Sequence, residues 1–266
     1  MGFYKKYQSI VKSNRSFVCV GLDSDLHKLP DCVKKEKNPV LIFNKKIIDA
    51  TYEHCACYKP NFAFYLAQGV NGIETLKQTI EYIPPQIPTI IDIKANDIGN
   101  TMEQYANSVF QYFKADAMTI NTLMGTDVIS ACLKSDDSFA FALAITSNAS
   151  AKDFFYQGDL YQKIATQISQ VSAERIGAVV GATRIDDFTK MRLIMPKAIF
   201  LIPGVGAQGG DLQAVCKHAK ASVDTPLFLI NSSRGIIYAD DSESFAKTAG
   251  KETVKLKDEI NFELKI

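Results

Sequence analysis

Short apolar runs rich in β-branched and aromatic residues recur along the whole chain, and this repetition limits the possible folds more than any other feature. Eight runs can be counted, with helix-like stretches between most of them. Near-continuous apolar strands are typical of a parallel sheet buried on both faces, whereas half-exposed strands alternate. The order of strand and helix therefore predicts an α/β fold with a parallel sheet. The runs cover residues 17–22, 56–59, 89–93, 117–120, 139–145, 176–180, 198–202 and 227–230.

The number of these units and the chain length suggest how the sheet closes. Eight strand–helix units in 266 residues match the usual size of a (β/α)8 TIM barrel. An open dinucleotide-binding sheet would carry a Gly-x-Gly-x-x-Gly turn after its first strand, and no such turn follows residues 17–22. No linker or low-complexity segment divides the chain, so we expect one barrel domain over residues 1–266. The expected helices cover residues 39–52, 72–83, 101–113, 160–175, 184–195 and 211–219.

Composition narrows the possible partners and the compartment. Thirty basic and 29 acidic residues leave a net charge of +1, so no bulk field would draw the protein to nucleic acid or to an anionic membrane. No apolar run reaches the length of a membrane span, and the N-terminal segment lacks the apolar core of a signal peptide. Six scattered cysteines form neither a disulfide framework nor a complete zinc-ligand set. We therefore expect a cytoplasmic protein with reduced thiols and no bound metal.

Charged residues gather where the predicted strands end. In a parallel barrel, the loops at the carboxyl ends of the strands converge on one face, which carries the active site. The third run leads directly into Asp92, Lys94 and Asp97. Side chains alternate along a strand, so Asp92 and Lys94 face the same side, and the cost of burying charge under the outer helices places them toward the open end of the lumen. Other polar residues at strand ends are Asp23, Lys59, Asn61, Asn121, Thr146 and Ser147.

The segment DIKANDIGNT at residues 92–101 resembles the D-x-K-x-x-D-I-x-x-T signature of the orotidine 5'-phosphate decarboxylase family. Further segments are similar to the family in the same order, and the Lys-Pro-Asn segment resembles the family's second subgroup. The resemblance implies a TIM-barrel carboxy-lyase that converts orotidine 5'-monophosphate to uridine 5'-monophosphate, the last step of de novo pyrimidine nucleotide synthesis, without metal or cofactor. The matching segments are VGLD at 20–23, YKPN at 58–61, PGVGAQGGD at 203–211 and NSSRGIIY at 231–238.

The same resemblance implies which residues act. The catalytic row would be Lys59, Asp92, Lys94 and Asp97. In a homodimer, Asp97 and Thr101 would reach across the interface into the partner's site. The substrate contacts that the resemblance implies come from Asp23, Asn61, Thr101, Ser147, Pro203, Gln208, Gly209 and Arg234.

Individual roles for the binding residues also follow from the resemblance. Asp23 and the lysine of the second strand would hold the ribose hydroxyls, with Asn61 supporting the ribose end, and Ser147 would hydrogen-bond the pyrimidine ring. Gln208 and Arg234 would bind the 5'-phosphate. Independently of the family, backbone N–H groups of a glycine-rich loop and a planar guanidinium suit phosphate oxygens.

The residue types also suit the chemistry. Loss of carbon dioxide from C6 leaves an electron pair in the plane of the ring, with no cofactor to accept it. A Lys94 ammonium can stabilise that carbanion and then donate the replacing proton. Asp92 beside the departing carboxylate would disfavour the ground state, and the flanking Lys59 and Lys94 would keep it ionised. Residues 148–158, polar and next to the predicted base site, are expected to form a lid.

Several alternatives remain open from the sequence. The charged row could be a structural ion-pair layer, Asp23 a helix cap, Ser147 a turn residue, and the glycines after residue 203 ordinary turn glycines. One rival function is a magnesium-dependent sugar-phosphate decarboxylase or aldolase with the same Asp-x-Lys-x-x-Asp pattern, which a chelator would inhibit. Another is a catalytically silent, phosphate-binding dimeric scaffold. The sequence leaves open whether a separate orotate phosphoribosyltransferase is a partner.

Overall fold

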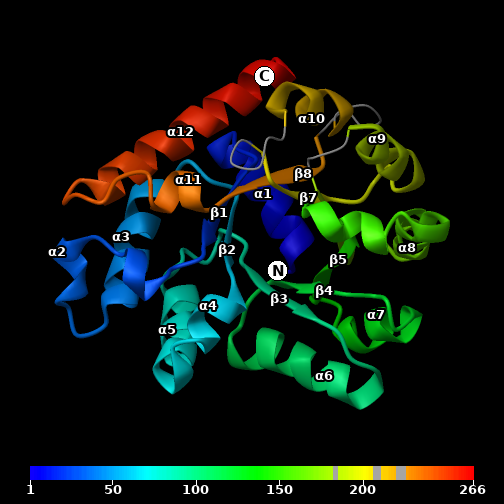
Figure 1. Cartoon of the computed structure of the whole chain (residues 1–266), viewed down its shortest axis with the longest axis horizontal. Coiled ribbons are helices and arrows are strands. Elements are labelled where there is room, and N and C mark those ends of the chain that lie inside the picture. Colours follow the sequence, from blue (N-terminus) through cyan, green and yellow to red (C-terminus); the bar gives the residue numbers. More distant parts are fainter. Residues whose placement is uncertain (182–184, 206–210, 220–225) are drawn as a thin grey trace.

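Eight parallel strands are arranged in a ring, with helices on its outside (Figure 1). The computed structural model describes residues 1–181, 185–205, 211–219 and 226–266. The strands follow the order β2-β1-β8-β7-β6-β5-β4-β3, and isolated bridges Tyr58–Thr89 and Asn61–Asp92 join the two ends of this row. The predicted TIM barrel is therefore confirmed. The strands are β1 Val18–Leu22, β2 Cys57–Pro60, β3 Ile90–Ala95, β4 Ala117–Ile120, β5 Phe139–Ile145, β6 Ile176–Val180, β7 Phe200–Pro203 and β8 Phe228–Ser232.

Helices of two or more turns follow most strands and cover the sheet. The start of α3 illustrates the local logic: Pro39 occupies the first turn, and the Asn38 side chain accepts a hydrogen bond from the Leu41 N–H at 3.2 Å. These helices are α3 Pro39–Thr51, α5 Gly69–Tyr82, α6 Gly99–Asn107, α7 Thr126–Cys132, α8 Leu160–Ser169, α9 Ile185–Ile194, α10 Leu212–Ala219 and α12 Phe245–Leu264. Shorter segments are α2 Asp31–Lys34, α4 Phe62–Leu66, α11 Arg234–Ile237, η1 Leu26–Lys28, η2 Ser108–Tyr112, η3 Ala149–Asp153 and η4 Gln157–Asp159.

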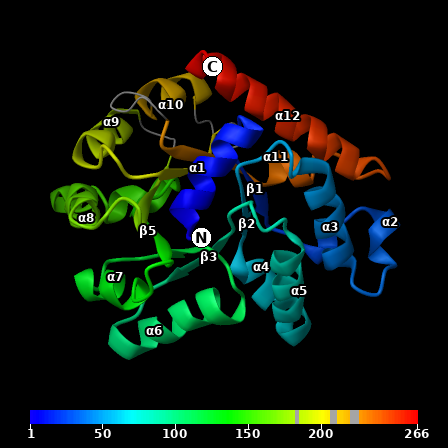
Figure 2. The same ribbon diagram turned by 180° about the vertical axis from the view of Figure 1, so that it is seen from behind.

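The N-terminal helix α1, Phe3–Asn14, lies across the end of the barrel where the strands begin (Figure 2). Phe3 packs against Phe139 and Phe141 of β5, with ring centroids 4.6 and 5.3 Å apart. The Tyr7 hydroxyl lies 3.1 Å from the Phe228 carbonyl oxygen, to which it can donate a hydrogen bond. This end of the barrel is therefore covered, and the opposite, carboxyl end is the side from which a ligand can enter.

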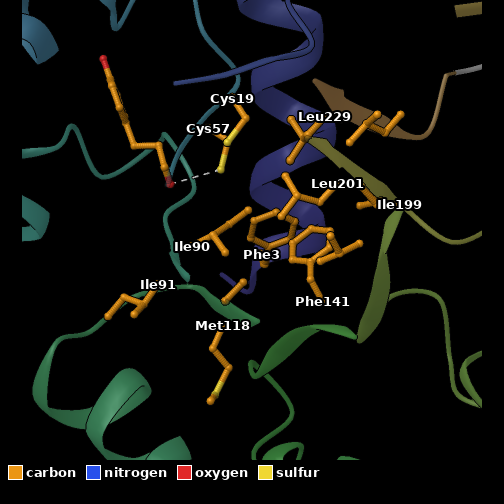
Figure 3. Packing of buried hydrophobic residues seen from close by; sticks show 14 of the residues in the cluster. Phe3, Cys19, Cys57, Ile90, Ile91, Met118, Phe141, Ile199, Leu201 and Leu229 are labelled. Atoms are coloured by element: carbon orange, nitrogen blue, oxygen red, sulfur yellow. Dashed lines mark hydrogen bonds between the residues drawn. The ribbon is translucent and has the colours of Figure 1, made fainter. Parts of the chain in front are cut away.

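Apolar side chains, with aromatic rings such as Phe141 among them, fill the barrel interior (Figure 3). Cys19 of β1 and Cys57 of β2 are register partners, as are Leu201 of β7 and Leu229 of β8, and all four are buried. All six cysteines are free, and only Cys32 is exposed. Within the described ranges, no group of three His, Cys, Asp or Glu side chains could hold a metal ion. No helix in the described part of the chain is long and apolar enough to cross a membrane.

Candidate active site

A cavity of about 270 Å³ opens at the carboxyl end of the barrel. It contains four of the residues predicted from the sequence for catalysis or ring binding: Lys59, Asp92, Lys94 and Ser147. Pro203, at the end of β7, also lines it. A larger and more open groove of about 1160 Å³ lies between η1, α3, α4 and α5, but it contains none of the predicted site residues. The remaining lining residues are Thr119, Leu143, Thr146, Asn148, Val179 and Leu201.

Asp92 is the centre of the charged row, because three donors reach its carboxylate. The Lys59 ammonium lies 2.7 Å from Oδ2, and the Lys94 ammonium lies 2.6 Å from Oδ1. The Thr119 hydroxyl donates a third hydrogen bond to Oδ1 at 2.9 Å. Lys59 and Asp92 are 4% and 9% exposed, whereas the Lys94 side chain is 47% exposed. Lys94 is therefore the member of the row that is most exposed to a ligand in the cavity.

Mutual attraction keeps the two buried members of the row charged. Burial alone would raise the pKa of Asp92, but the positive charges of Lys59 and Lys94 outweigh it and hold this pKa far below its usual value. Burial alone would lower the pKa of Lys59, but Asp92 and Asp23 outweigh it and raise this pKa. At neutral pH the Lys59–Asp92 pair at the cavity floor is thus an ion pair.

The backbone that carries Asp92 and Lys94 is irregular. Ile91 pairs with Met118 and Ala95 pairs with Ile120, so three residues of β3 stand opposite one residue of β4, Thr119. Within this bulge Lys94 has a φ of 50°, in the left-handed region. A non-glycine residue held there costs on the order of 1–3 kcal/mol, and such strain concentrates at functional sites. The bulge re-aims the Lys94 side chain at the mouth of the cavity.

A carboxylate oxygen without a partner lies just after β1, on a predicted site residue that does not line the cavity. Asp23 follows β1, and its Oδ1 is buried without a hydrogen bond in the described structure. Tyr238 lies beside it, because its hydroxyl accepts a hydrogen bond from the Asp25 N–H at 2.6 Å and donates one to the Asp23 carbonyl oxygen at 3.3 Å. Burial raises the pKa of Tyr238 to about 12, so its hydroxyl keeps its proton. A buried carboxylate oxygen without a donor is suited to a ligand hydroxyl.

Two glycines allow the site residues to approach each other. A Cβ on Gly181, at the end of β6, would lie 2.8 Å from the backbone N and Cα of Ser147, so only glycine lets the Ser147 segment come this close. A Cβ on Gly21 of β1 would lie 1.9 Å from the Oγ of Ser233, which is the residue that precedes Arg234 in the sequence. Sequence reasoning assigned no role to Gly181.

The predicted lid segment forms two short helical turns, η3 and η4, rather than an extended loop. Its start is held by a hydrogen bond of 2.6 Å from the Thr146 hydroxyl to the Asn148 side chain. Its end is held from α9, where the Asp187 carboxylate accepts hydrogen bonds from the Tyr156 hydroxyl at 2.6 Å and the Tyr161 hydroxyl at 3.3 Å. The segment therefore connects the cavity rim to α9.

Some predicted residues lie away from the cavity. Asp97 accepts a hydrogen bond from the Ile98 N–H at 2.8 Å, and neither Asp97 nor the exposed Thr101 lines the cavity. Asn61 caps α4 by accepting from the Ala63 N–H at 3.2 Å. Arg234 is exposed at the start of α11. Gln208 and Gly209 lie outside the described residues.

Sequence reasoning also missed residues that the structure places in the cavity. Thr119 and the apolar side chains of Leu143, Val179 and Leu201 all line it. The apolar residues were predicted as core strand, and their pointing into the lumen follows from the alternation of side chains. Thr119 is a lone hydroxyl in an apolar strand, and this signal is weak because threonine is common in strands.

Comparison with protein families and sequences gives a consistent result. The model of the family described as orotidine 5'-phosphate decarboxylase / HUMPS matches residues 16–249. Orotidine 5'-phosphate decarboxylase of Christiangramia forsetii is 44% identical over 262 residues, which are 96% of each chain. The protein of the same name from Porphyromonas gingivalis is 42% identical over 261 residues, 94% of each chain.

Solved structures are similar over nearly all of the chain. OMP decarboxylase of Leishmania donovani is 30% identical with a TM-score of 0.83, and the match covers 98% of this chain and 99% of that one. UMP synthase of Leishmania donovani is 33% identical with a TM-score of 0.84. In that case the match covers 98% of this chain but only 56% of the longer chain.

Proposed function

This chain belongs to the orotidine 5'-phosphate decarboxylase / HUMPS family, and on that premise we propose that it releases carbon dioxide from orotidine 5'-monophosphate to leave uridine 5'-monophosphate. It is a carboxy-lyase of pyrimidine nucleotide synthesis. The observation that carries the proposed mechanism is the Lys59–Asp92–Lys94 row at the floor of the cavity, with its two short ion pairs of 2.7 and 2.6 Å.

The reaction proceeds by charge complementarity at C6. The bond between C6 and the carboxylate carbon breaks, carbon dioxide leaves, and the electron pair stays on C6. The Lys94 ammonium stabilises this pair, and one of its protons then moves to C6, which leaves a neutral amine that solvent reprotonates. Asp92 faces the substrate carboxylate, and the repulsion between the two anions disappears when carbon dioxide departs. Lys59 and Asp23 bind the ribose hydroxyls, with Asn61 supporting that end, and Ser147 hydrogen-bonds the ring.

The phosphate is bound at the β7–β8 side of the mouth by Gln208 and Arg234, and Pro203 and Gly209 provide further substrate contacts. Phosphate sites of TIM barrels commonly lie after strands seven and eight. Each charge-assisted hydrogen bond contributes about 1.5–3 kcal/mol, which is small beside the roughly 20 kcal/mol that enzymes remove from the slowest reactions. This binding energy instead closes the segment 148–158 over the ring. Support for this lid comes from its position, since Thr146, Ser147 and Asn148 already form the cavity rim.

The active form is a homodimer in which Asp97 and Thr101 complete the partner's site. One observation supports this: among the described residues of its own subunit, Asp97 forms no ion pair with a lysine, whereas Asp92 forms two. Large apolar side chains are also exposed around it, on the segment after β3, on α6 and after β4. Ile98 is 56% exposed, Leu123 50% and Met124 51%. Exposed apolar side chains gathered in this way are typical of an interface.

A mixed-dimer experiment tests this shared site. Lys94→Ala and Asp97→Ala proteins are each expected to be nearly inactive as homodimers. If they are mixed after reversible dissociation, half of the dimers are mixed, and each mixed dimer regains one intact site. About a quarter of the wild-type activity should therefore return for a symmetric dimer with shared sites. Measured turnover that stays at the level of the separate variants would contradict the shared site.

The activity itself is tested on the purified protein in the presence of EDTA. Orotidine 5'-monophosphate should be consumed, with loss of its ultraviolet absorbance, and uridine 5'-monophosphate should be recovered by chromatography. The lysine pair around Asp92 supports independence from metal, because two ammonium groups repel a divalent cation. Absence of turnover would contradict the proposal. Turnover that is lost with EDTA and restored by magnesium would favour the magnesium-dependent rival.

We also propose that residues 1–266 form one domain that acts in the cytoplasm. Helices α1 and α12, from the two ends of the chain, pack on the same barrel: Tyr7 bonds to β8, and buried residues of α12 belong to the common core. Six free thiols are typical of a reducing compartment.

A further inference from the structure

We propose that Thr119 is a positioning residue for the decarboxylation, and that its single hydroxyl sets both the backbone of Lys94 and the carboxylate of Asp92. This inference rests on the proposed function of the Lys/Asp row. Thr119 is 1% exposed and lies in the middle of β4, between Met118 and Ile120. Its hydroxyl donates to Asp92 Oδ1 at 2.9 Å and accepts from the Lys94 main-chain N–H at 2.8 Å.

The first function of the hydroxyl follows from the bulge in β3. Regular pairing with β4 stops at Ile91 and resumes at Ala95, whose carbonyl oxygen accepts from the Asn121 N–H at 2.9 Å. Between these points the Lys94 N–H has no strand partner, and its bond goes to the Thr119 side chain instead. A main-chain donor without a partner would be costly inside a barrel. Thr119 therefore stabilises Lys94 in its left-handed conformation, which aims the ammonium at the cavity.

The second function concerns the orientation of Asp92. A threonine hydroxyl has one proton, and here the bond from Lys94 occupies its acceptor side, so the proton points to Asp92 Oδ1. Oδ1 thus receives two donors, Thr119 and the Lys94 ammonium, and Oδ2 receives Lys59. Both oxygens of the Asp92 carboxylate are therefore held, and this fixes the orientation of the carboxylate plane. A single lysine with its flexible side chain would not fix it.

This arrangement has a consequence at the proton-transfer step. When the Lys94 ammonium gives its proton to C6, Asp92 loses one of its two positive neighbours. The Thr119 hydroxyl and Lys59 remain, so Asp92 stays an anion and does not compete with C6 for the proton. Thr119 bonds to the Asp92 side chain and to the Lys94 main chain. It has no proton to supply to C6, because its hydroxyl proton is donated to Asp92.

The test compares Thr119→Val, which keeps the shape and removes the hydroxyl, with Thr119→Ser, which keeps the hydroxyl. In Thr119→Val, kcat should fall roughly tenfold to a hundredfold, as expected when a buried hydrogen-bond partner is lost. KM for orotidine 5'-monophosphate and the affinity for uridine 5'-monophosphate should change less than about threefold, because phosphate and ribose contacts are untouched. Thr119→Ser should restore most of kcat.

A matched control separates positioning from a general structural role. Thr122→Val serves for this, because Thr122 lies just after β4, is 2% exposed, and its hydroxyl is buried without a hydrogen-bond partner in the described structure. This control removes a buried hydroxyl that touches neither Asp92 nor Lys94, so it should leave both kcat and KM unchanged.

Thr119→Val with wild-type kcat, or with a loss of kcat that Thr119→Ser does not recover, would overturn the proposal. If Thr119→Val does not fold, Thr119→Ser and Thr119→Ala give the same comparison, since both lack the γ-methyl group and only Ser keeps the hydroxyl. Equal kcat in that pair would likewise overturn it. Failure of the function as a whole is distinguishable, because then the wild-type protein itself would not convert orotidine 5'-monophosphate.

Discussion

Lys94→Ala is expected to lower kcat by roughly 10⁴-fold or more, because one side chain supplies both electrostatic stabilisation and the proton. General acid catalysis contributes about 10²–10⁴-fold, and a preorganised charge at the developing carbanion contributes about 10²–10³-fold. Uridine 5'-monophosphate should still bind, since the Lys59–Asp92 ion pair and the phosphate-binding loops remain. Single-turnover kinetics and calorimetric titration measure the two quantities.

Lys251→Ala serves as the control, because Lys251 is exposed on α12 and lies outside the cavity. It should show wild-type kinetics. A Lys94→Ala protein that retains a tenth or more of the wild-type rate would rule out the proposed role of Lys94.

Asp92→Asn is expected to lower both turnover and stability. It removes the anion that holds Lys94 at 2.6 Å and faces the substrate carboxylate, so kcat should fall by roughly 10²–10³-fold, the cost of losing one preorganised group. It also leaves the buried Lys59 ammonium without its counter-ion, and breaking a buried pair costs about 3–5 kcal/mol. Steady-state kinetics and chemical unfolding measure these effects.

The pH dependence of this stability difference has a definite sign. The pKa of Asp92 is lowered in the folded state, so its contribution is present above the unfolded value of about 3.9 and is lost as the pH falls below it. The stability gap between wild type and Asp92→Asn should therefore shrink between about pH 5 and pH 2. Asp31→Asn is the matched control, since it removes an ion pair of similar length, 2.8 Å, on the surface, where Asp31 is 93% exposed. A gap that is constant with pH would contradict the assignment to Asp92.

The barrel could be predicted because its strands are buried on both faces. Strands β4, β5 and β6 begin and end where the apolar runs do. Strands β3 and β8 extend farther, to Ala95 and Ser232, because polar residues interrupt the apolar runs there: Lys94 in β3, and Asn231 and Ser232 in β8. A hydrophobic criterion ends a strand where the active site begins, so it shortens the strands that matter most for function.

The terminal helices and the true ends of two others were missed. In α1 the buried residues Phe3, Tyr7, Ile10 and Val11 have helical spacing, so the signal was present in the sequence. In α12 small or polar residues such as Ala249 and Thr253 occupy buried positions, which hides its apolar face. The predicted helix 160–175 ends at Ser169, and the predicted helix 101–113 divides into α6 and the wider turn η2.

Within the site, the charged row could be predicted but its geometry could not. Asp92 and Lys94 follow from charge at a strand end, and Lys59 from the resemblance to the family. The bulge opposite Thr119 depends on the pairing register of β3 with β4, which no local pattern records. Threonine is also common in strands for reasons of packing alone, so its type does not single it out.

The cover that α1 forms over the start of the barrel has a consequence for biosynthesis. Tyr7 is made early, yet its partner Phe228 lies 221 residues later in the chain. During translation the first helix must therefore wait, with its aromatic side chains exposed, until the last strand has left the ribosome. Slow elongation late in the message would prolong this exposure and leave more time for chaperone binding or aggregation.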